Sequence, residues 1–249
     1  MEEGEPGGAT ASFAVTPYTR NCARLYERAE HVLVGVSPGN GYFNKPRLSA
    51  LLRWAGARFD QVDAVVPDVS LTHTYQALGQ PPALAWKNAN HKAGKTRRRV
   101  ARAWDDIGVA RAEQRIHLLS DFVDHPHYGR MRAHFDAVLD ADPALREAFV
   151  EASRHVLRAY LKGGEPTGEQ IDEGTNYLAA EMPLCLDTPT IMGVPSSVTV
   201  YHRWMPMIEA MFASPYTDVS PLQGHVVARP QENAPEPDGG DGDGGGGSE

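Results

Sequence analysis

A serine, Ser37, directly follows the apolar run 31–36, and its hydroxyl could serve as a nucleophile. Apolar runs of this length, bounded by turn residues, are typical of buried strands. Side chains alternate along a strand, so Leu33, Gly35 and Ser37 share one face and the intervening valines share the other. Open α/β sheets bind ligands at the carboxyl ends of their strands, and Gly35 leaves room there for close approach.

The same segment matches the G-x-S-x-G pattern of α/β-hydrolases through Gly35, Ser37 and Gly39. Acids and then His202 follow later in the chain, in the order of a hydrolase triad. Pro38 argues against this interpretation, because a hydrolase needs a backbone N–H after the serine for its oxyanion hole. The segment taken alone favours an ordinary serine in a turn at the end of a strand.

Tyr177 and Glu181 are four residues apart, so on a helix they share a face. We expect this helix to cover residues 168–182 and to stop at Pro183, which places Glu181 at its C-terminus. That end carries partial negative charge and disfavours an acid. A buried Glu181 would need a proton or a cation, and a ligand ammonium could supply it. An exposed glutamate at a frayed end, or one paired with a distant arginine, is the simpler alternative for this residue alone.

Residues 69–104 contain no Asp or Glu, and cations are concentrated in the second half of this interval. Four of them follow the spacing i, i+3, i+7, i+10, which forms one stripe along a helix. An uninterrupted cationic stripe is typical of a surface that binds a polyanion. The spacing does not distinguish tRNA from other RNA or from an acidic protein. The stripe and its neighbours in sequence are Lys92, Lys95, Arg97, Arg98, Arg99 and Arg102.

Composition limits the classes of protein to consider. The net charge of −8 comes from the two ends of the chain, because nine of the 32 acidic residues and none of the 24 basic ones lie in residues 1–11 and 231–249. These tails are predicted to be disordered. Two cysteines, no signal peptide and no membrane-spanning apolar run predict a cytoplasmic protein without a metal site.

The rest of the chain, residues 12–230, is predicted to form one α/β domain with a mostly parallel sheet flanked by helices. Residues 12–30 form a lead-in with one helix, a loop precedes the basic segment, and residues 183–203 have no clear pattern. The expected strands are 31–36, 62–67, 115–119 and 225–229. The expected helices are 46–58, 86–104, 126–140, 143–162, 168–182 and 205–213.

Taken together, these features resemble the cyclodipeptide synthases, enzymes that join the amino acids of two aminoacyl-tRNAs into a diketopiperazine. The resemblance covers about residues 31–230 and includes the basic helix. Three separate motifs in the right order are far more specific than any one of them. They are 35–43 (GVSPGNGYF), 176–184 (NYLAAEMPL) and 194–202 (VPSSVTVYH).

The resemblance implies a Rossmann-type domain similar to the catalytic domain of class I tyrosyl- and tryptophanyl-tRNA synthetases. It implies ping-pong covalent catalysis through aminoacyl-Ser37 and dipeptidyl-Ser37, without ATP or any other cofactor. Tyr177 and Glu181 would hold the aminoacyl ammonium, with Glu181 as the base, and Tyr201 would assist proton transfer. The expected partners are two aminoacyl-tRNAs, and the protein is expected to be a monomer.

Asn40 and His202 would organise the site, and together with Tyr201 they place the chain in the subgroup named for Asn, Tyr and His. Thr199 is polar, whereas the resemblance leads us to expect an aliphatic residue at this position. The amino acid that the first-substrate pocket prefers is therefore left open. That pocket would be lined by Leu33, Gly35, Val65, Leu119, Leu184 and Thr199.

Two rival functions predict different behaviour. An α/β-hydrolase-type serine esterase would hydrolyse a nitrophenyl ester rapidly and ignore tRNA. A non-catalytic tRNA-binding module would be unaffected by Ser37→Ala, and it would leave Tyr177 and Glu181 without a purpose.

Overall fold

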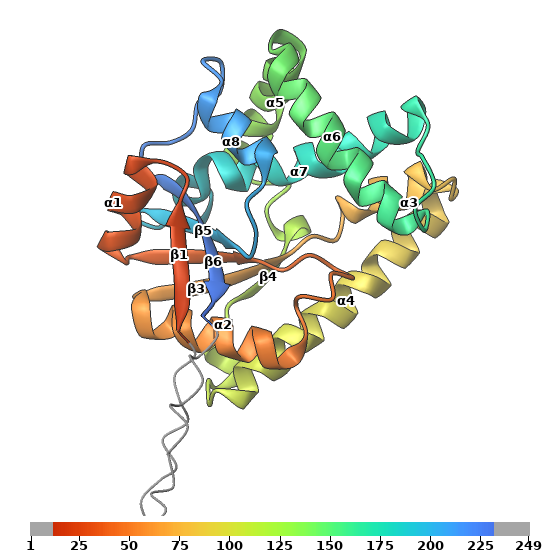
Figure 1. The fold of residues 1–249 in the computed structure, drawn as a ribbon. Coiled ribbons are helices and arrows are strands. Elements are labelled where there is room, and N and C mark those ends of the chain that lie inside the picture. The colour runs from red at the N-terminus through yellow and green to blue at the C-terminus, as the bar shows by residue number, and fades with distance from the viewer. Residues whose placement is uncertain (1–11, 232–249) are drawn as a thin grey trace, which may run out of the picture.

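The computed structural model describes residues 12–231, which form a six-stranded sheet with helices on both faces (Figure 1). The strand order is β1-β6-β5-β2-β3-β4, and all neighbours are parallel except β1, which runs antiparallel to β6. The expected α/β fold with a mostly parallel sheet is therefore confirmed. The strands are β1 (Phe13–Pro17), β2 (His31–Gly35), β3 (Gln61–Val66), β4 (Ile116–Leu118), β5 (Ser197–Tyr201) and β6 (Gln223–Pro230).

The two faces of the sheet carry different helices. Helices α1, α2 and α4 pack on one face, while α5 and α7 lie over the other with α6 and α8 beyond them (Figure 1). Helix α3 contacts both α4 and α7. The helices are α1 (Arg20–Arg28), α2 (Lys45–Arg58), α3 (Leu71–Ala77), α4 (Pro82–Asp106), α5 (Pro126–Ala141), α6 (Pro143–Tyr160), α7 (Gly168–Met192) and α8 (Pro206–Ala213); short 3₁₀ turns cover Arg111–Glu113 and Leu119–Asp121.

Alternation along β2 separates the core from the site, as the sequence predicted. Val32, Val34 and Val36 are fully buried in the main core against α2 and α4. Leu33 belongs to a separate apolar cluster on the opposite face, beneath α5 and α7. The period of two therefore directs the valines into the core and leaves Leu33, Gly35 and Ser37 for the site.

The prediction that Pro183 ends its helix is wrong. Helix α7 continues to Met192, with one non-helical residue, Asp187, at φ −156° and ψ 61°. Met182 and Leu184 beside the proline are buried against neighbouring helices, so tertiary packing offsets the lost backbone hydrogen bond. The Asp187 carboxylate accepts the N–H of Thr190 and so caps the restarted turn.

Three other segments have more structure than the sequence suggested. The lead-in 12–30 holds β1 as well as α1, the expected loop before the basic segment holds α3, and the unassigned stretch 183–203 holds β5. Each element is short, and each is stabilised by partners distant in sequence: β1 by β6, α3 by α7 and β5 by β2 and β6. Local patterns carry little information about such elements.

No helix in residues 12–231 is long and apolar enough to cross a membrane. The tails predicted to be disordered, 1–11 and 231–249, lie outside the described residues except for Gln231.

Candidate active site

The sheet changes direction of winding at β2, which has β3 on one side and β5 on the other. Ligands bind at such switch points in open α/β sheets, outside the carboxyl ends of the strands. Ser37 follows β2, and Tyr201 is the last residue of β5. Their hydroxyl oxygens lie 3.2 Å apart, so two predicted site residues meet at the switch point.

Asn40 orients the Tyr201 hydroxyl. Its Oδ1 accepts the backbone N–H of Tyr42 at 2.9 Å, which identifies the other end of the amide as the donor. The Nδ2 group then lies 3.5 Å from the Tyr201 oxygen. Because Asn40 donates to that oxygen, the phenol proton is free to serve the Ser37 oxygen.

His202 supports this group from outside the cavity. Its ring stacks on Tyr42 with 4.0 Å between ring centroids, and it also contacts Tyr201 and Phe43. Burial, and then the nearby Arg203, lower the pKa of His202 to about 4. A neutral, stacked ring suits the predicted organising role.

The Ser37 side chain faces a cavity of about 580 Å³ between the sheet and helices α6 and α7. A Cβ built on Gly35 would meet no atom within 4 Å, so this position opens into the cavity without backbone strain. All six residues predicted for the first-substrate pocket line this cavity: Leu33, Gly35, Val65, Leu119, Leu184 and Thr199.

Tyr177 and Glu181 line the same cavity from α7. The Glu181 Oε1 atom is inaccessible to solvent and has no hydrogen-bond partner among residues 12–231. Burial raises the pKa of Glu181 to about 7, and the Tyr177 hydroxyl partly offsets this effect. The pKa of Tyr177 is also raised by burial and by the Glu181 charge. Glu181 is half-buried and lies mid-helix rather than at the C-terminus, so the helix-end argument is wrong.

The basic helix α4 adjoins the loop that carries Ser37. Gly39 has a φ of 85°, and a Cβ there would lie 2.8 Å from Lys92 Cε. The left-handed conformation favours glycine here, and a larger residue would also require the end of the Lys92 side chain to move. Arg99 donates to the Phe43 carbonyl at 3.0 Å. A second cavity of about 410 Å³ lies between this loop and α4, lined by Gly39, Asn40, Gly41, Tyr75, Asn88, His91, Lys92, Lys95, Thr96 and Arg99.

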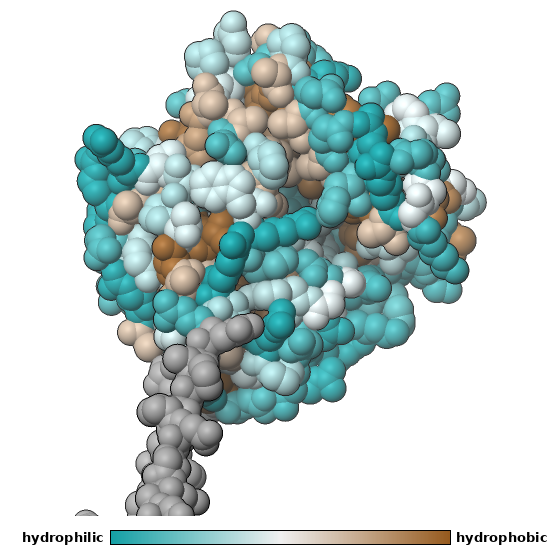
Figure 2. All heavy atoms as spheres, viewed as in Figure 1, coloured by the Kyte–Doolittle hydropathy of each residue, from teal (hydrophilic) through white to brown (hydrophobic). Residues whose placement is uncertain are grey.

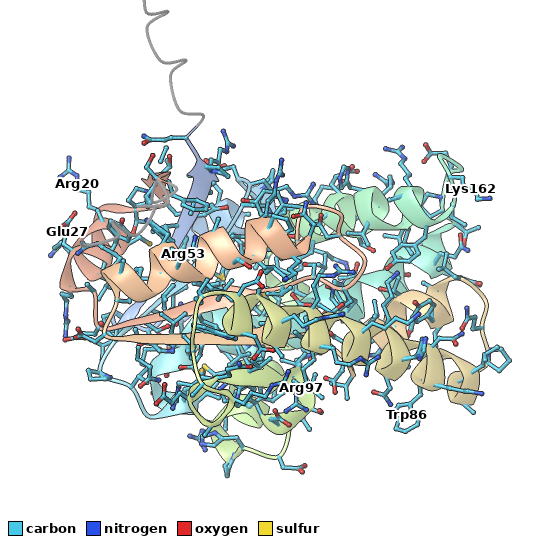
Figure 3. All side chains as sticks on the ribbon, turned by 90° about the horizontal axis from the view of Figure 1, so that it is seen from below. Arg20, Glu27, Arg53, Trp86, Arg97 and Lys162 are labelled. Carbon is cyan, nitrogen blue, oxygen red and sulfur yellow. The ribbon has the colours of Figure 1, made fainter. Side chains whose placement is uncertain are left out.

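Arg97 lies on a different side of α4 from Lys95 and Arg99. It lies two residues from both Lys95 and Arg99, which is about 160° around the helix axis. Arg97 and Trp86 project from the side of α4 turned away from α2 (Figure 3). The structure therefore groups Lys92, Lys95 and Arg99 with the Ser37 loop and leaves Arg97 on another flank.

The main cavity extends beyond the residues found from sequence. Tyr18 and Trp204 stack at 3.9 Å between ring centroids, although they are far apart in the chain. The surface is hollowed beneath α6 on the face drawn in Figure 2. No local motif marks these positions, because the fold alone brings them together. The added lining residues include Tyr18, Glu147, Glu151, His155, Arg203 and Trp204.

A buried polar network lies under the cavity floor on the same sheet face. Burial alone would raise the pKa of Asp63, but hydrogen bonds from His117, His31 and Arg115 outweigh it and hold the pKa low. Asp63 is a fully paired carboxylate and forms no part of a metal cluster: residues 12–231 contain no group of three His, Cys, Asp or Glu side chains suited to a metal ion.

The family model for cyclodipeptide synthases matches residues 13–230, almost the whole described chain. The chain belongs to this family. The resemblance suggested by three motifs is thereby confirmed, and the protein is an enzyme of the cyclodipeptide synthase class.

Known cyclodipeptide synthases are similar to this one over most of their length. The cyclo(L-tyrosyl-L-tyrosyl) synthase of Mycobacterium tuberculosis is 32% identical over 232 residues, which cover 92% of this chain and 80% of the relative. The cyclo(L-leucyl-L-phenylalanyl) synthase of Streptomyces noursei is 33% identical over 217 residues, which cover 84% and 89%.

A solved structure from Mycobacterium tuberculosis, which relates cyclodipeptide synthetases to type I tRNA synthetases, matches with a TM-score of 0.76 at 33% identity. The match covers 90% of this chain and 96% of that one. The predicted likeness between this synthase and the class I synthetase fold is thus confirmed.

Proposed function

We propose that this cyclodipeptide synthase joins two amino acids delivered by aminoacyl-tRNAs, through covalent intermediates on Ser37, and that residues 12–230 are the catalytic unit. One observation carries the proposal: the nucleophile candidate Ser37 lines one cavity with the half-buried Glu181, whose Oε1 has no hydrogen-bond partner within residues 12–231, and this cavity lies beside a cationic helix. An aminoacyl-tRNA supplies the ester, the ammonium and the polyanion that these three features fit.

The first step is ester exchange. Ser37 Oγ attacks the carbonyl carbon of the first aminoacyl ester, and the bond from that carbon to the tRNA 3′-terminal oxygen breaks. Tyr201 lies close enough to the Ser37 oxygen to relay the proton to the departing tRNA oxygen. One ester replaces another, so the step needs no further activation and leaves an aminoacyl-Ser37.

The second step forms the peptide bond. The ammonium of aminoacyl-Ser37 gives a proton to Glu181, whose raised pKa of about 7 suits a general base. The free amine then attacks the ester of the second aminoacyl-tRNA and releases that tRNA. Atom balance requires this direction, because attack of the second amine on the Ser37 ester would leave the dipeptide on tRNA.

Ring closure releases the product. The terminal amine of dipeptidyl-Ser37 attacks the Ser37 ester carbonyl, which forms the second amide bond and returns the proton to Ser37 Oγ. Both reacting groups are held on one short chain, so the step gains from effective concentration. Tyr201 is placed to carry the proton back.

The tRNA would lie along the stripe of Lys92, Lys95, Arg99 and Arg102. Lys92 lies against Gly39, and Arg99 donates a hydrogen bond to Phe43, so both cations adjoin the loop that carries Ser37. A tRNA whose phosphates bind α4 would therefore place its 3′ end near the nucleophile. Salt-dependent binding is expected, because phosphate contacts displace counterions.

The geometry does not favour a serine esterase. Ser37 Oγ is hydrogen-bonded to the Tyr201 hydroxyl, and within residues 12–231 no histidine forms a hydrogen bond with Ser37 Oγ. Pro38 also lacks the N–H expected at an oxyanion hole.

The test is to trap the enzyme with radiolabelled aminoacyl-tRNA and measure the label retained after denaturation. We expect label on the native protein and none on Ser37→Ala, while Ser70→Ala, which changes a buried serine outside the cavity lining, keeps it. Equal labelling of the native protein and Ser37→Ala would overturn the covalent scheme.

A further inference from the structure

Gln223 is completely buried at the start of β6, and its amide group makes three hydrogen bonds. Its Oε1 accepts the backbone N–H of Thr188 at 3.0 Å. A backbone N–H can only donate, so this contact identifies the oxygen end of the amide. The Nε2 group therefore donates to Thr199 Oγ1 at 3.1 Å and to the Gly224 carbonyl at 2.9 Å.

This arrangement makes the Thr199 hydroxyl an acceptor toward Gln223 and leaves its own proton for another partner. Within the part of the chain that the structure describes, the Thr199 hydroxyl donates no hydrogen bond. Thr199 lines the main cavity, where Leu33 is its register partner on β2. A donor in apolar surroundings is costly until something accepts it, so the pocket is suited to a ligand with an acceptor at this point.

His225 supplies the complementary group. It is the register partner of Thr199 on β6 and lines the same cavity. Its Nε2 lies 2.8 Å from the Cys185 carbonyl oxygen, which can only accept, so Nε2 carries the proton. Burial lowers the pKa of His225 to about 4, which keeps the ring neutral and Nδ1 free of a proton near neutral pH. A donor and an acceptor thus lie on adjacent strands of the pocket floor.

The depth of Thr199 and His225 in the pocket favours a substrate with a long side chain. Thr199 pairs with Leu33, two residues before β2 ends at Gly35, and strands rise about 3.3 Å per residue, so the pair lies about 7 Å below the carboxyl end of the strand. An acyl group on Ser37 must therefore be long to reach it. The walls on the way are the aliphatic side chains of Leu33, Leu119 and Leu184, which suit an apolar stem.

We propose that the first amino acid loaded on Ser37 is tyrosine, whose phenol oxygen accepts the Thr199 proton and whose phenol proton is donated to His225 Nδ1. Among the standard amino acids, tyrosine combines a long apolar stem with a terminal hydroxyl. Phenylalanine has the same stem and leaves both polar groups without a partner. This inference rests on the proposed function, since it names the substrate of the Ser37 acylation.

The experiment compares Ser37 labelling of the full chain by tyrosyl-, phenylalanyl- and leucyl-tRNA at equal concentrations. A site that bonds a substrate hydroxyl rejects the analogue without it strongly, so we expect tyrosyl transfer to be at least about 100-fold faster than phenylalanyl transfer. Thr199→Val, which has the same shape without the hydroxyl, should slow tyrosyl transfer and bring the two rates within about tenfold. Thr199→Ser keeps the hydroxyl and should restore most of the preference.

Thr190→Val is the matched control, because Thr190 is exposed at the end of α7. It should leave the preference unchanged. Phenylalanyl or leucyl transfer as fast as tyrosyl transfer, or an unchanged preference in a folded Thr199→Val protein, would overturn the inference while leaving the proposed function intact. Absence of labelling from all three tRNAs would instead count against covalent loading itself, and the inference would fall with it.

Discussion

The Ser37 hydroxyl and the Tyr201 hydroxyl, 164 residues apart in the chain, lie 3.2 Å from one another where the winding of the sheet reverses. Asn40 donates to the same phenol oxygen and is itself fixed by a backbone N–H. The phenol proton is therefore not used by Asn40 and is available to the Ser37 oxygen. This relationship places a phenol hydroxyl, rather than a histidine, next to the Ser37 hydroxyl.

Tyr201→Phe removes the relay and keeps the ring that packs against Phe43. We expect cyclodipeptide formation to fall about 100-fold or more, in the range usual for loss of an acid–base group. Binding of aminoacyl-tRNA should be nearly unchanged, which filter binding can check. A Tyr201→Phe enzyme with native turnover would remove the phenol from the mechanism.

Glu181→Gln tests the Glu181 carboxyl group through the free energy of unfolding. Because folding raises its pKa from 4.5 to about 7, its ionisation destabilises the native state as pH rises through this interval. The amide variant resembles the protonated acid, so both proteins should be equally stable below about pH 4.5. Above pH 7 the variant should be more stable by on the order of 3 kcal/mol. Urea unfolding at pH 4.5 and pH 8 measures this, and a difference independent of pH would contradict it.

The same substitution should abolish activity, because the amide cannot accept the ammonium proton. Native activity should rise as the pH passes through about 7, where Glu181 ionises. The pH profile of product formation is measured for the native enzyme and for Glu181→Asp. A shift of the profile in the variant assigns the ionisation to position 181. An active Glu181→Gln enzyme would assign the base elsewhere.

The sequence predicted those parts of the site that depend on local patterns. Alternation along residues 31–36 was enough to place Leu33 and Ser37 on the site face. Glu181 was identified for its apolar surroundings, but its position within the helix was wrong because packing carries α7 through Pro183. The Tyr18–Trp204 stack and the orientation of the Gln223 amide depend on contacts between distant segments, for which one sequence holds no local signal.

Arg102 and Arg97 form a matched pair for the tRNA surface. Both are exposed arginines on α4, but Arg102 continues the stripe from Lys95 and Arg99, whereas Arg97 lies on another flank. Arg102→Ala should weaken aminoacyl-tRNA binding severalfold and reduce the slope of affinity against salt by about one. Arg97→Ala should change neither quantity. Equal losses from the two variants would assign binding to the whole helix rather than to the stripe.

Gly174 tests the packing of the helix that carries Tyr177 and Glu181. A Cβ at this position would lie 2.5 Å from Ser153 Oγ and 3.1 Å from Leu157 Cδ1, both on the buried face of α6. To accept Gly174→Ala, either the Ser153 hydroxyl must leave its hydrogen bond to the Ile171 carbonyl and Leu157 must shift, or helices α6 and α7 must separate. Overpacking of this kind costs about 1–3 kcal/mol. Gly129→Ala is the control, because a Cβ in that helix meets nothing within 4 Å and alanine favours helix formation. In urea unfolding, Gly174→Ala should lower the midpoint and Gly129→Ala should keep or raise it. Equal shifts in the same direction would show that α7 does not depend on this close approach.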